Sequence, residues 1–242
     1  MEHPLIDLSH IFKSYDGDLI LDDLSLSVKE NSFVTLLGPS GCGKTTTLRI
    51  IGGFEKPDKG QVIFDGEDIT NMPPNKRQLN TVFQKYALFT HMSIAENIAF
   101  GLKIKGKSKS YIDDKIKYAL KLVNLDGFEN RSVDSLSGGQ QQRISIARAI
   151  LKDAPIVVFD EATSYSDIEN EHKIQLALQN LLRGKTTIMI AHRLHTIRNA
   201  DKIFAFQDGK VVEQGTHDEL IASGSTYSHM WDTYTRETIG EE

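Results

Sequence analysis

Three short stretches of the chain are apolar almost throughout and rich in β-branched or aromatic residues. They read SFVTLL at Ser32–Leu37, PIVVFDEA at Pro155–Ala162 and TTIMIAH at Thr186–His192. Such runs are typical of strands covered on both faces of a parallel sheet, because neither side of the strand meets water. We therefore expect these stretches to form buried strands of a mostly parallel sheet.

Between the apolar runs, the apolar positions change to helical spacing. Side chains three and four residues apart line one side of a helix and turn it toward a core. The pattern predicts a helix-rich insert between roughly Ala87 and Asp153. The positions that carry it are Ile112, Ile116, Ala119, Leu120 and Val123 in one helix, and Ile144, Ala147, Ile150 and Leu151 in the next.

Two further stretches place short apolar runs around an Asp-Gly pair, which is a common hairpin turn. They are QVIFDGEDI at Gln61–Ile69 and KIFAFQDGKVVEQG at Lys202–Gly215, and the second is a good hairpin candidate. Both predict antiparallel β-structure. The expected fold class is therefore α/β, with a mostly parallel sheet, some antiparallel β-structure and a helical insert.

Composition limits which binding partners and which cellular compartment we expect for the protein. The 242 residues are 39% hydrophobic, enough for one large domain or two small ones, and the formal net charge is −5. This acidic balance argues against nucleic acid as the main partner, because neutralising phosphates needs a basic face. The single cysteine, Cys42, excludes an internal disulfide and is typical of a reducing compartment.

The ends and linkers of the chain indicate where it works. The N-terminus, MEHPLIDLSH, lacks the apolar segment of a signal peptide, and no apolar run approaches the ~20 residues that cross a bilayer. We expect a cytosolic protein that serves a membrane process only by docking onto another chain. The basic stretch KIKGKSKS at Lys103–Ser110 predicts a surface loop.

A glycine-rich stretch follows the first apolar run. Residues Gly38–Thr45 match the P-loop pattern G-x-x-x-x-G-K-[ST]. Glycines let backbone N–H groups curl around a polyphosphate, Lys44 can reach its β and γ oxygens, and the Thr45 hydroxyl can hold Mg²⁺. A simple glycine-rich turn is the alternative, but the position between a strand and a helix favours a nucleotide site. Cys42 is either an oxidation-sensitive thiol or simply a small residue in a crowded loop.

Two later strands end in polar residues that could bind a metal or take part in catalysis. Asp160 and Glu161 follow IVVF, and His192 ends the next apolar run. Ligands of open α/β sheets bind at the carboxyl ends of strands, so Asp160 is placed to hold Mg²⁺ through water and Glu161 to act as base for the attacking water. His192 at the same edge favours a γ-phosphate contact. The histidines show no metal-ligand spacing, so we reject a zinc site.

A second glycine-rich motif, DSLSGGQQQR at Asp134–Arg143, has no lysine. Ser137 can cap a helix from about Gly138, and the glycines leave backbone N–H groups open to an anion; a well-capped surface helix is the simpler interpretation. With this motif the chain resembles, over essentially its whole length, the nucleotide-binding domain of ABC transporters. The resemblance implies a P-loop NTPase (RecA-like) core and a head-to-tail dimer, in which this surface closes on ATP held by the other subunit's P-loop.

The resemblance assigns roles to single positions. It implies that Tyr15 stacks on adenine, that Gln84 touches Mg²⁺ and the water and senses the membrane subunit, and that Asp167 stands at the loop crossing to the partner. It makes Glu161 the catalytic base and His192 the switch histidine. The predicted site residues are catalytic Lys44, Glu161 and His192; nucleotide-binding Tyr15, Gly38, Pro39, Ser40, Gly41, Cys42, Gly43, Lys44, Thr45, Thr46, Gln84, Ser137, Gly138, Gly139, Gln140 and Asp167; and metal-binding Thr45, Gln84 and Asp160.

The two halves of the chain resemble different branches of this family. Residues up to the LSGGQQQR motif are similar to ATPases of bacterial importers of the polyamine, iron and sugar type. From about Ile144, the stretches ISIARAILKDAPIVVFDEATS and TTIMIAHRLHTIRNADKIFAFQDGKVVEQGTHDELI are similar to exporters whose ATPase is fused to the membrane domain. Two explanations remain open: a natural or engineered recombination near residues 140–150, or independent drift of one ancestral domain.

The resemblance implies a Mg²⁺-dependent ATPase subunit that dimerises around two ATP molecules and energises transport through separate permease subunits. It would be cytoplasmic, and peripheral on the inner face of the cell membrane when assembled. We expect one domain over residues 1–242, with 1–86 and 154–242 as ATP-binding core and 87–153 as helical subdomain. The alternatives are a soluble ABC ATPase acting on DNA or ribosomes, and a chimeric ATP-binding module without a transport partner.

Overall fold

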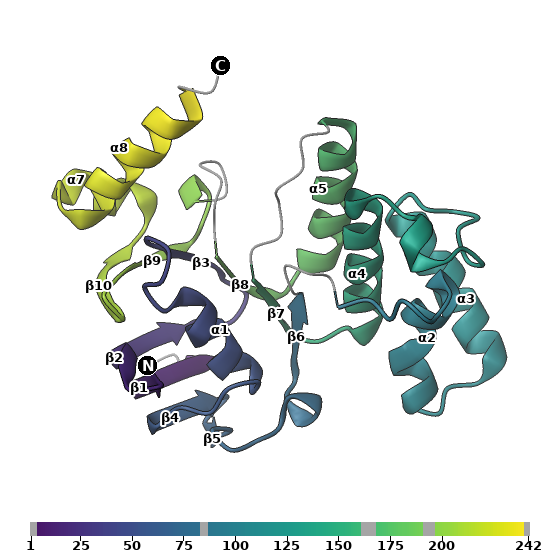
Figure 1. Ribbon diagram of the computed structural model, residues 1–242, viewed down its shortest axis with the longest axis horizontal. Coiled ribbons are helices and arrows are strands. Elements are labelled where there is room, and N and C mark those ends of the chain that lie inside the picture. Colours follow the sequence, from purple (N-terminus) through teal and green to yellow (C-terminus); the bar gives the residue numbers. More distant parts are fainter. Residues whose placement is uncertain (1–3, 83–86, 161–167, 191–196, 240–242) are drawn as a thin grey trace. The chain divides into compact units, whose positions relative to one another are not determined.

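The fold is seen in a computed structural model that describes residues 4–82, 87–160, 168–190 and 197–239. The chain divides into two compact units (Figure 1). The first unit comprises Met1–Leu79, Val158–Glu161 and Lys185–Glu242, and the second comprises Asn80–Val157 and Ala162–Gly184.

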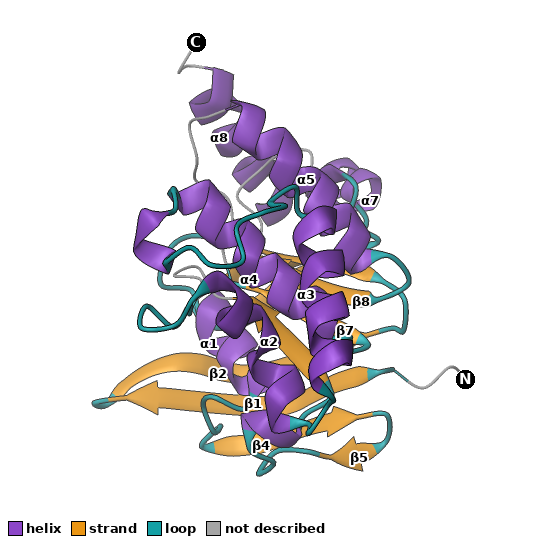
Figure 2. Cartoon of the chain, turned by 90° about the vertical axis from the view of Figure 1, so that its right-hand side faces the viewer, coloured by secondary structure: helices purple, strands orange, loops and turns teal. Residues whose placement is uncertain are grey.

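An antiparallel sheet forms one part of the first unit (Figure 2). Its strand order is β2-β1-β4-β5. The predicted antiparallel pairing within Gln61–Ile69 is confirmed by β4 and β5, but the pairing of β4 with β1 was not foreseen. The bounds are β1 Ile6–Tyr15, β2 Asp18–Val28, β4 Lys59–Phe64 and β5 Glu67–Asp68.

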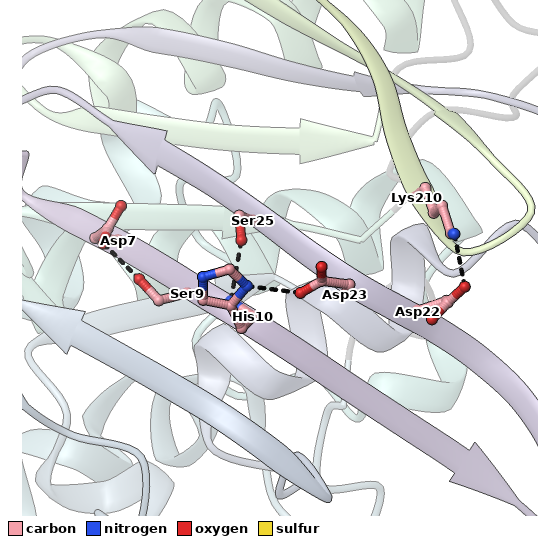
Figure 3. Close-up of polar contacts among 7 residues, drawn as sticks. All are labelled: Asp7, Ser9, His10, Asp22, Asp23, Ser25 and Lys210. Carbon is pink, nitrogen blue, oxygen red and sulfur yellow. Dashed lines mark hydrogen bonds and ion pairs between the residues drawn. The ribbon is translucent and has the colours of Figure 1, made fainter.

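A shift in register interrupts the pairing of β1 with β2 (Figure 3). His10 and Asp23 both have positive φ, 52° and 56°, and the Nδ1 atom of His10 lies 2.7 Å from a carboxylate oxygen of Asp23. The backbone N–H of His10 donates to the hydroxyl of Ser25. Side chains therefore hold the chain where the ladder is irregular.

The second sheet contains the buried strands that the apolar runs predict. β3 pairs in parallel with both β8 and β9, and β10 pairs antiparallel with β9 through an Asp208-Gly209 turn, which confirms the predicted hairpin. The strand order is β10-β9-β3-β8-β7-β6. The bounds are β3 Phe33–Leu37, β6 Leu79–Val82, β7 Ile156–Phe159, β8 Thr186–Ile190, β9 Lys202–Gln207 and β10 Lys210–Gly215.

Helices of the first unit follow these strands. Helix α1 (Lys44–Gly52) begins shortly after β3, and the short η1 (Pro74–Lys76) precedes β6. After β10 the chain forms α7 (His217–Ser223) and α8 (Thr226–Ile239), and both helices contact β10. Their core includes the fully buried Tyr227.

The described part of the second unit is mainly helical, as the apolar spacing predicts. Helix α4 lies at its centre and contacts α2, α3 and α5 (Figure 1). Because α4 has neighbours on several sides, even Gln142 and Arg143 are buried, and Arg143 donates to the carbonyls of Val123 and Asn124 after α3. The bounds are α2 Ile94–Ile104, α3 Lys109–Leu122, η2 Val133–Ser135, α4 Gly138–Lys152 and α5 Ile168–Leu182.

Candidate nucleotide-binding site

The loop between β3 and α1 requires glycine for steric reasons. A Cβ atom on Gly43, whose φ is 97°, would lie 2.4 Å from the Leu21 side chain, and one on Gly38 would lie 2.5 Å from the carbonyl oxygen of Phe206. The loop therefore runs close against two strands. No side chain among the described residues caps the first turn of α1, so its leading N–H groups are free to face an anion.

Lys44 is folded back over this loop. The side chain is buried, and its Nζ atom donates to the carbonyls of Gly38 and Pro39, each at 2.7 Å. Nζ also lies 3.4 Å from the Cys42 sulfur, and that thiol is itself buried, which favours its interpretation as a packing residue. Carbonyl dipoles thus hold a positive charge at the centre of the loop, where an anionic phosphate would find it.

Thr45 and Asp160 meet although 115 positions separate them in the sequence. The Thr45 hydroxyl, in the first turn of α1, donates to a carboxylate oxygen of Asp160 at 3.2 Å, directly after β7. A hydroxyl and a carboxylate are hard oxygen donors, which suit Mg²⁺ when the remaining positions are filled by water and phosphate oxygens. Among the described residues no cluster of three His, Cys, Asp or Glu side chains could hold a metal, so a cation here would depend on such additional ligands.

Tyr15, at the end of β1, lies beside the loop. Its hydroxyl hydrogen-bonds to the side chain of Thr46, and the ring is about a third exposed. Burial and then the negative charge of Glu55 raise the pKa of the Tyr15 phenol, so it stays neutral at ordinary pH. The Nζ atom of Lys13 lies 5.1 Å from the ring centroid. Lys13 and Glu55 were missed in the sequence, because only the folding of β1 brings them to this ring.

The second motif is built as the sequence predicts. Ser137 is the N-cap of α4: its hydroxyl oxygen accepts from the N–H of Gln140 at 3.3 Å, and the Ser137 N–H donates to the Gln140 side chain at 3.0 Å. Gln140 was predicted to bind nucleotide, and in this structure its side chain completes the cap. Ser137 is exposed, so this turn lies on the surface of the second unit.

The remaining predicted positions fall into three groups. Gly138 and Gly139 are the first two residues of α4, and Gly139 is buried. Pro39, Ser40 and Gly41 form the exposed tip of the loop. Four predicted site residues lie outside the described residues: Gln84, Glu161, Asp167 and His192. Among the helices that the structure describes, none is long and apolar enough to span a membrane.

The chain is similar to known proteins over most of its length. Residues 21–164 match the family described as "ABC transporter". The chain is 48% identical over 223 residues to the "Spermidine/putrescine import ATP-binding protein PotA" of Clostridium novyi (strain NT), covering 91% of this chain and 64% of the relative. It is 45% identical over 244 residues to the protein of the same name from Clostridioides difficile (strain 630), covering 100% and 69%. The chain therefore spans about two thirds of the length of these relatives.

A solved structure is similar to the fold. It is described as "Structure of a bacterial Atm1-family ABC exporter with ATP bound", and it matches 96% of this chain and 42% of that chain with a TM-score of 0.81 and 35% sequence identity. The match to the Clostridioides difficile protein covers 100% of this chain, and the comparisons do not show a junction near residues 140–150. The expected α/β fold with a P-loop core is confirmed.

Proposed function

The chain belongs to the ABC transporter family, and on this premise we propose that it binds and hydrolyses ATP to energise transport through separate membrane subunits. The observation that carries the proposal is the meeting of Thr45 with Asp160, together with the buried Lys44 side chain that the glycine-rich loop holds directly before Thr45. These groups come from the start of α1 and from the residue after β7, which the fold of the first unit brings together. Together they supply a positive charge and hard oxygen donors, which are the groups that a metal-bound polyphosphate needs.

Different residues would bind different parts of the nucleotide. Lys44 would exchange its two carbonyl acceptors for phosphate oxygens, which are stronger acceptors because they are charged. Thr45 and Asp160 would hold Mg²⁺, which when bound neutralises charge on the β- and γ-phosphates. Tyr15 offers a partly exposed ring for the base. Catalysis would then rest on positioning and on electrostatic stabilisation of the transferred group.

We assign the remaining steps by the family resemblance. Glu161 orients and deprotonates the attacking water, His192 contacts the γ-phosphate, and Gln84 reports on the membrane subunit. The Ser137 turn of a second copy closes the site, so the active form is a homodimer around two ATP molecules. Asp167 lies at the crossing between the copies.

We propose import as the direction of transport. The support is the 45–48% identity to proteins named as importers of spermidine and putrescine, against 35% to the exporter structure. A polyamine is accordingly the first substrate class to test. The protein would work on the cytoplasmic face of the membrane, bound to its permease.

Substitution of Lys44 tests the nucleotide site directly. Lys44→Ala should abolish ATP-dependent phosphate release and weaken ATP binding at least about tenfold, because it removes a charged donor to phosphate. The measurement is phosphate release and nucleotide titration on the purified chain. Lys56→Ala, at an exposed lysine of the same unit, is the matched control and should behave like the parent chain. Unchanged release in Lys44→Ala would show that the nucleotide is hydrolysed elsewhere.

A further inference from the structure

A concentration of positive charge stands out in the second unit. Between Lys103 and Lys121 the chain has seven lysines and two aspartates, in a protein whose net charge is −5. The segment consists of the end of α2, the connecting loop and most of α3. The rest of the chain is therefore more acidic than the total suggests, and this segment carries a local excess of positive charge.

Aromatic side chains are interleaved with these lysines. Tyr111 and Tyr118 are 42% and 51% exposed, and Ile104 at the end of α2 is 72% exposed. The Nζ atom of Lys107 lies 5.7 Å from the centroid of the Tyr111 ring. The Nζ atom of Lys115 lies 5.5 Å from the Tyr111 centroid and 5.3 Å from the Tyr118 centroid. We call Lys107, Tyr111, Lys115 and Tyr118 the lysine–tyrosine row.

Lys107, Tyr111 and Tyr118 are exposed and Lys115 is partly exposed, because α3 buries other positions. Ile112, Ile116, Ala119 and Leu120 are the buried residues of α3, which contacts α2 and α4. Tyr111, Lys115 and Tyr118 follow one another at spacings of four and three residues, so they share a neighbouring stripe of the helix. Core packing within the unit therefore explains the buried stripe but not the row.

We propose that the lysine–tyrosine row, with Ile104 and the flanking lysines, binds the anionic lipid headgroups of a membrane surface. Lysines meet the phosphates, while tyrosine rings suit the boundary between headgroup and acyl chain because one end is apolar and the other polar. An exposed isoleucine beside them adds apolar area for the same boundary. This contact goes beyond the proposed function, since it needs neither nucleotide nor permease.

The contacts favour lipid over nucleic acid. Single-stranded nucleic acid binds by stacking its bases on free aromatic faces. In the row, lysine ammonium groups lie 5.3–5.7 Å from the ring centroids and compete for those faces. Ile104 has no ring on which a base could stack, yet it is the most exposed of the large apolar side chains described.

Vesicle sedimentation tests the proposal. The full chain should bind vesicles of phosphatidylcholine with phosphatidylglycerol, bind pure phosphatidylcholine vesicles far less, and lose affinity as salt is raised. A lysine near such a surface contributes about fivefold to the partition coefficient, so the triple change Lys103→Gln, Lys107→Gln and Lys115→Gln should lower it about a hundredfold. The control is Lys56→Gln, Lys59→Gln and Lys76→Gln, three exposed lysines whose loss changes the net charge equally.

A fluorescence probe locates the contact. Tyr118→Trp should show a blue shift in emission with anionic vesicles, relative to the parent chain with its single tryptophan, because the ring enters a less polar layer. Leu19→Trp, at an exposed apolar position of β2, is the control and should not shift. The proposal is overturned by equal losses in the two lysine triples, by equal binding to neutral vesicles, by an unshifted Tyr118→Trp, or by binding of polyuridylate without vesicle binding.

Discussion

At the scale of single residues, Arg77 joins two segments of the first unit through hydrogen bonds that the sequence did not predict. Its buried guanidinium donates to the carbonyls of Ile50 and Ile51 at the end of α1, and to those of Ile69 and Met72 in the segment after β5. Burial lowers the pKa of Arg77 to about 10, which leaves the group charged at neutral pH. One cation therefore satisfies carbonyls of two segments and complements the negative end of α1.

Removing this guanidinium should be costly. Arg77→Met would leave several buried carbonyls without donors, and we expect a loss of about 3 kcal/mol in the free energy of unfolding. Urea denaturation followed by circular dichroism measures it. Arg49→Met, at an exposed arginine of α1, is the matched control and should change stability by less than about 0.5 kcal/mol. Equal losses in the two variants would contradict the role of Arg77.

At the scale of elements, two helices of the second unit begin with the same device. Ser93 caps α2 with Glu96, and Ser137 caps α4 with Gln140, each by a reciprocal pair of hydrogen bonds. After the cap, α4 continues with two glycines, whereas α2 continues with Ile94 and Ala95. The glycines cost helix stability, so a cap alone does not explain them.

Substitutions at these two caps distinguish an effect on stability from an effect on ATP hydrolysis. Ser137→Ala and Ser93→Ala should each lower stability by about 1 kcal/mol, because each loses one cap. Only Ser137→Ala should also slow ATP hydrolysis, about ten- to hundredfold, since a serine hydroxyl that accepts in the cap still has a proton to donate to phosphate. Turnover and urea denaturation on both variants measure the two effects. Equal turnover in the two variants would show that Ser137 does not contribute to the nucleotide site.

Helix α8 offers a prediction on pH. The N–H of Tyr227 donates to the Glu213 carboxylate, and the Tyr227 hydroxyl lies 2.7 Å from Nδ1 of His217. Burial raises the pKa of Tyr227 above its ordinary value, so the folded state holds the neutral phenol while the unfolded chain ionises from about pH 10. The stability that this phenol contributes is thus complete below about pH 10 and is lost as pH rises above it.

The comparison with Tyr227→Phe isolates that effect. Below about pH 10 the parent chain should be more stable by about 1 kcal/mol, for the hydrogen bond of the hydroxyl. Above about pH 10 this advantage should shrink and then reverse, by up to about 1.4 kcal/mol per pH unit. Urea titrations of both proteins between about pH 8 and about pH 11 give the difference. A constant difference over this range would contradict the burial of the phenol.

Sequence patterns predicted those elements whose signals are local. The apolar runs became β3, β7 and β8, and the Asp208-Gly209 turn joined β9 to β10. Strands β1 and β2 were not predicted, because their register shifts near His10 disturb the alternation that marks a strand. The long-range meeting of Thr45 with Asp160 was predictable because strand ends of a parallel sheet share an edge, whereas the partners of Arg77 are backbone carbonyls that no residue type reveals.

At the scale of the whole molecule, the two glycine-rich motifs lie in different units. The P-loop belongs to the first unit and the Ser137 turn to the second. The proposed function requires one nucleotide to meet the P-loop of one copy and the Ser137 turn of another. ATP should therefore hold two copies together as a dimer, and its hydrolysis should allow the two copies to separate.

A variant that holds ATP without hydrolysing it should trap that assembly. We expect Glu161→Gln to sediment as a dimer with ATP and Mg²⁺ and as a monomer without nucleotide, because the proposed base is lost while the charge-bearing Lys44 remains. Adding Lys44→Ala should give a monomer that binds ATP poorly. Adding Ser137→Arg instead should give a monomer that still binds ATP, because a bulky side chain obstructs only the partner's contact.

The control for this last variant is Ser93→Arg in the same Glu161→Gln background. It breaks an equivalent cap on α2 and adds the same charge, so its fold should be weakened to a similar extent. If it still dimerises with ATP while Ser137→Arg does not, the Ser137 turn contacts the second copy, and helix destabilisation is not the cause. If Glu161→Gln binds ATP tightly yet remains monomeric at every concentration tested, nucleotide binding stands but the shared site does not.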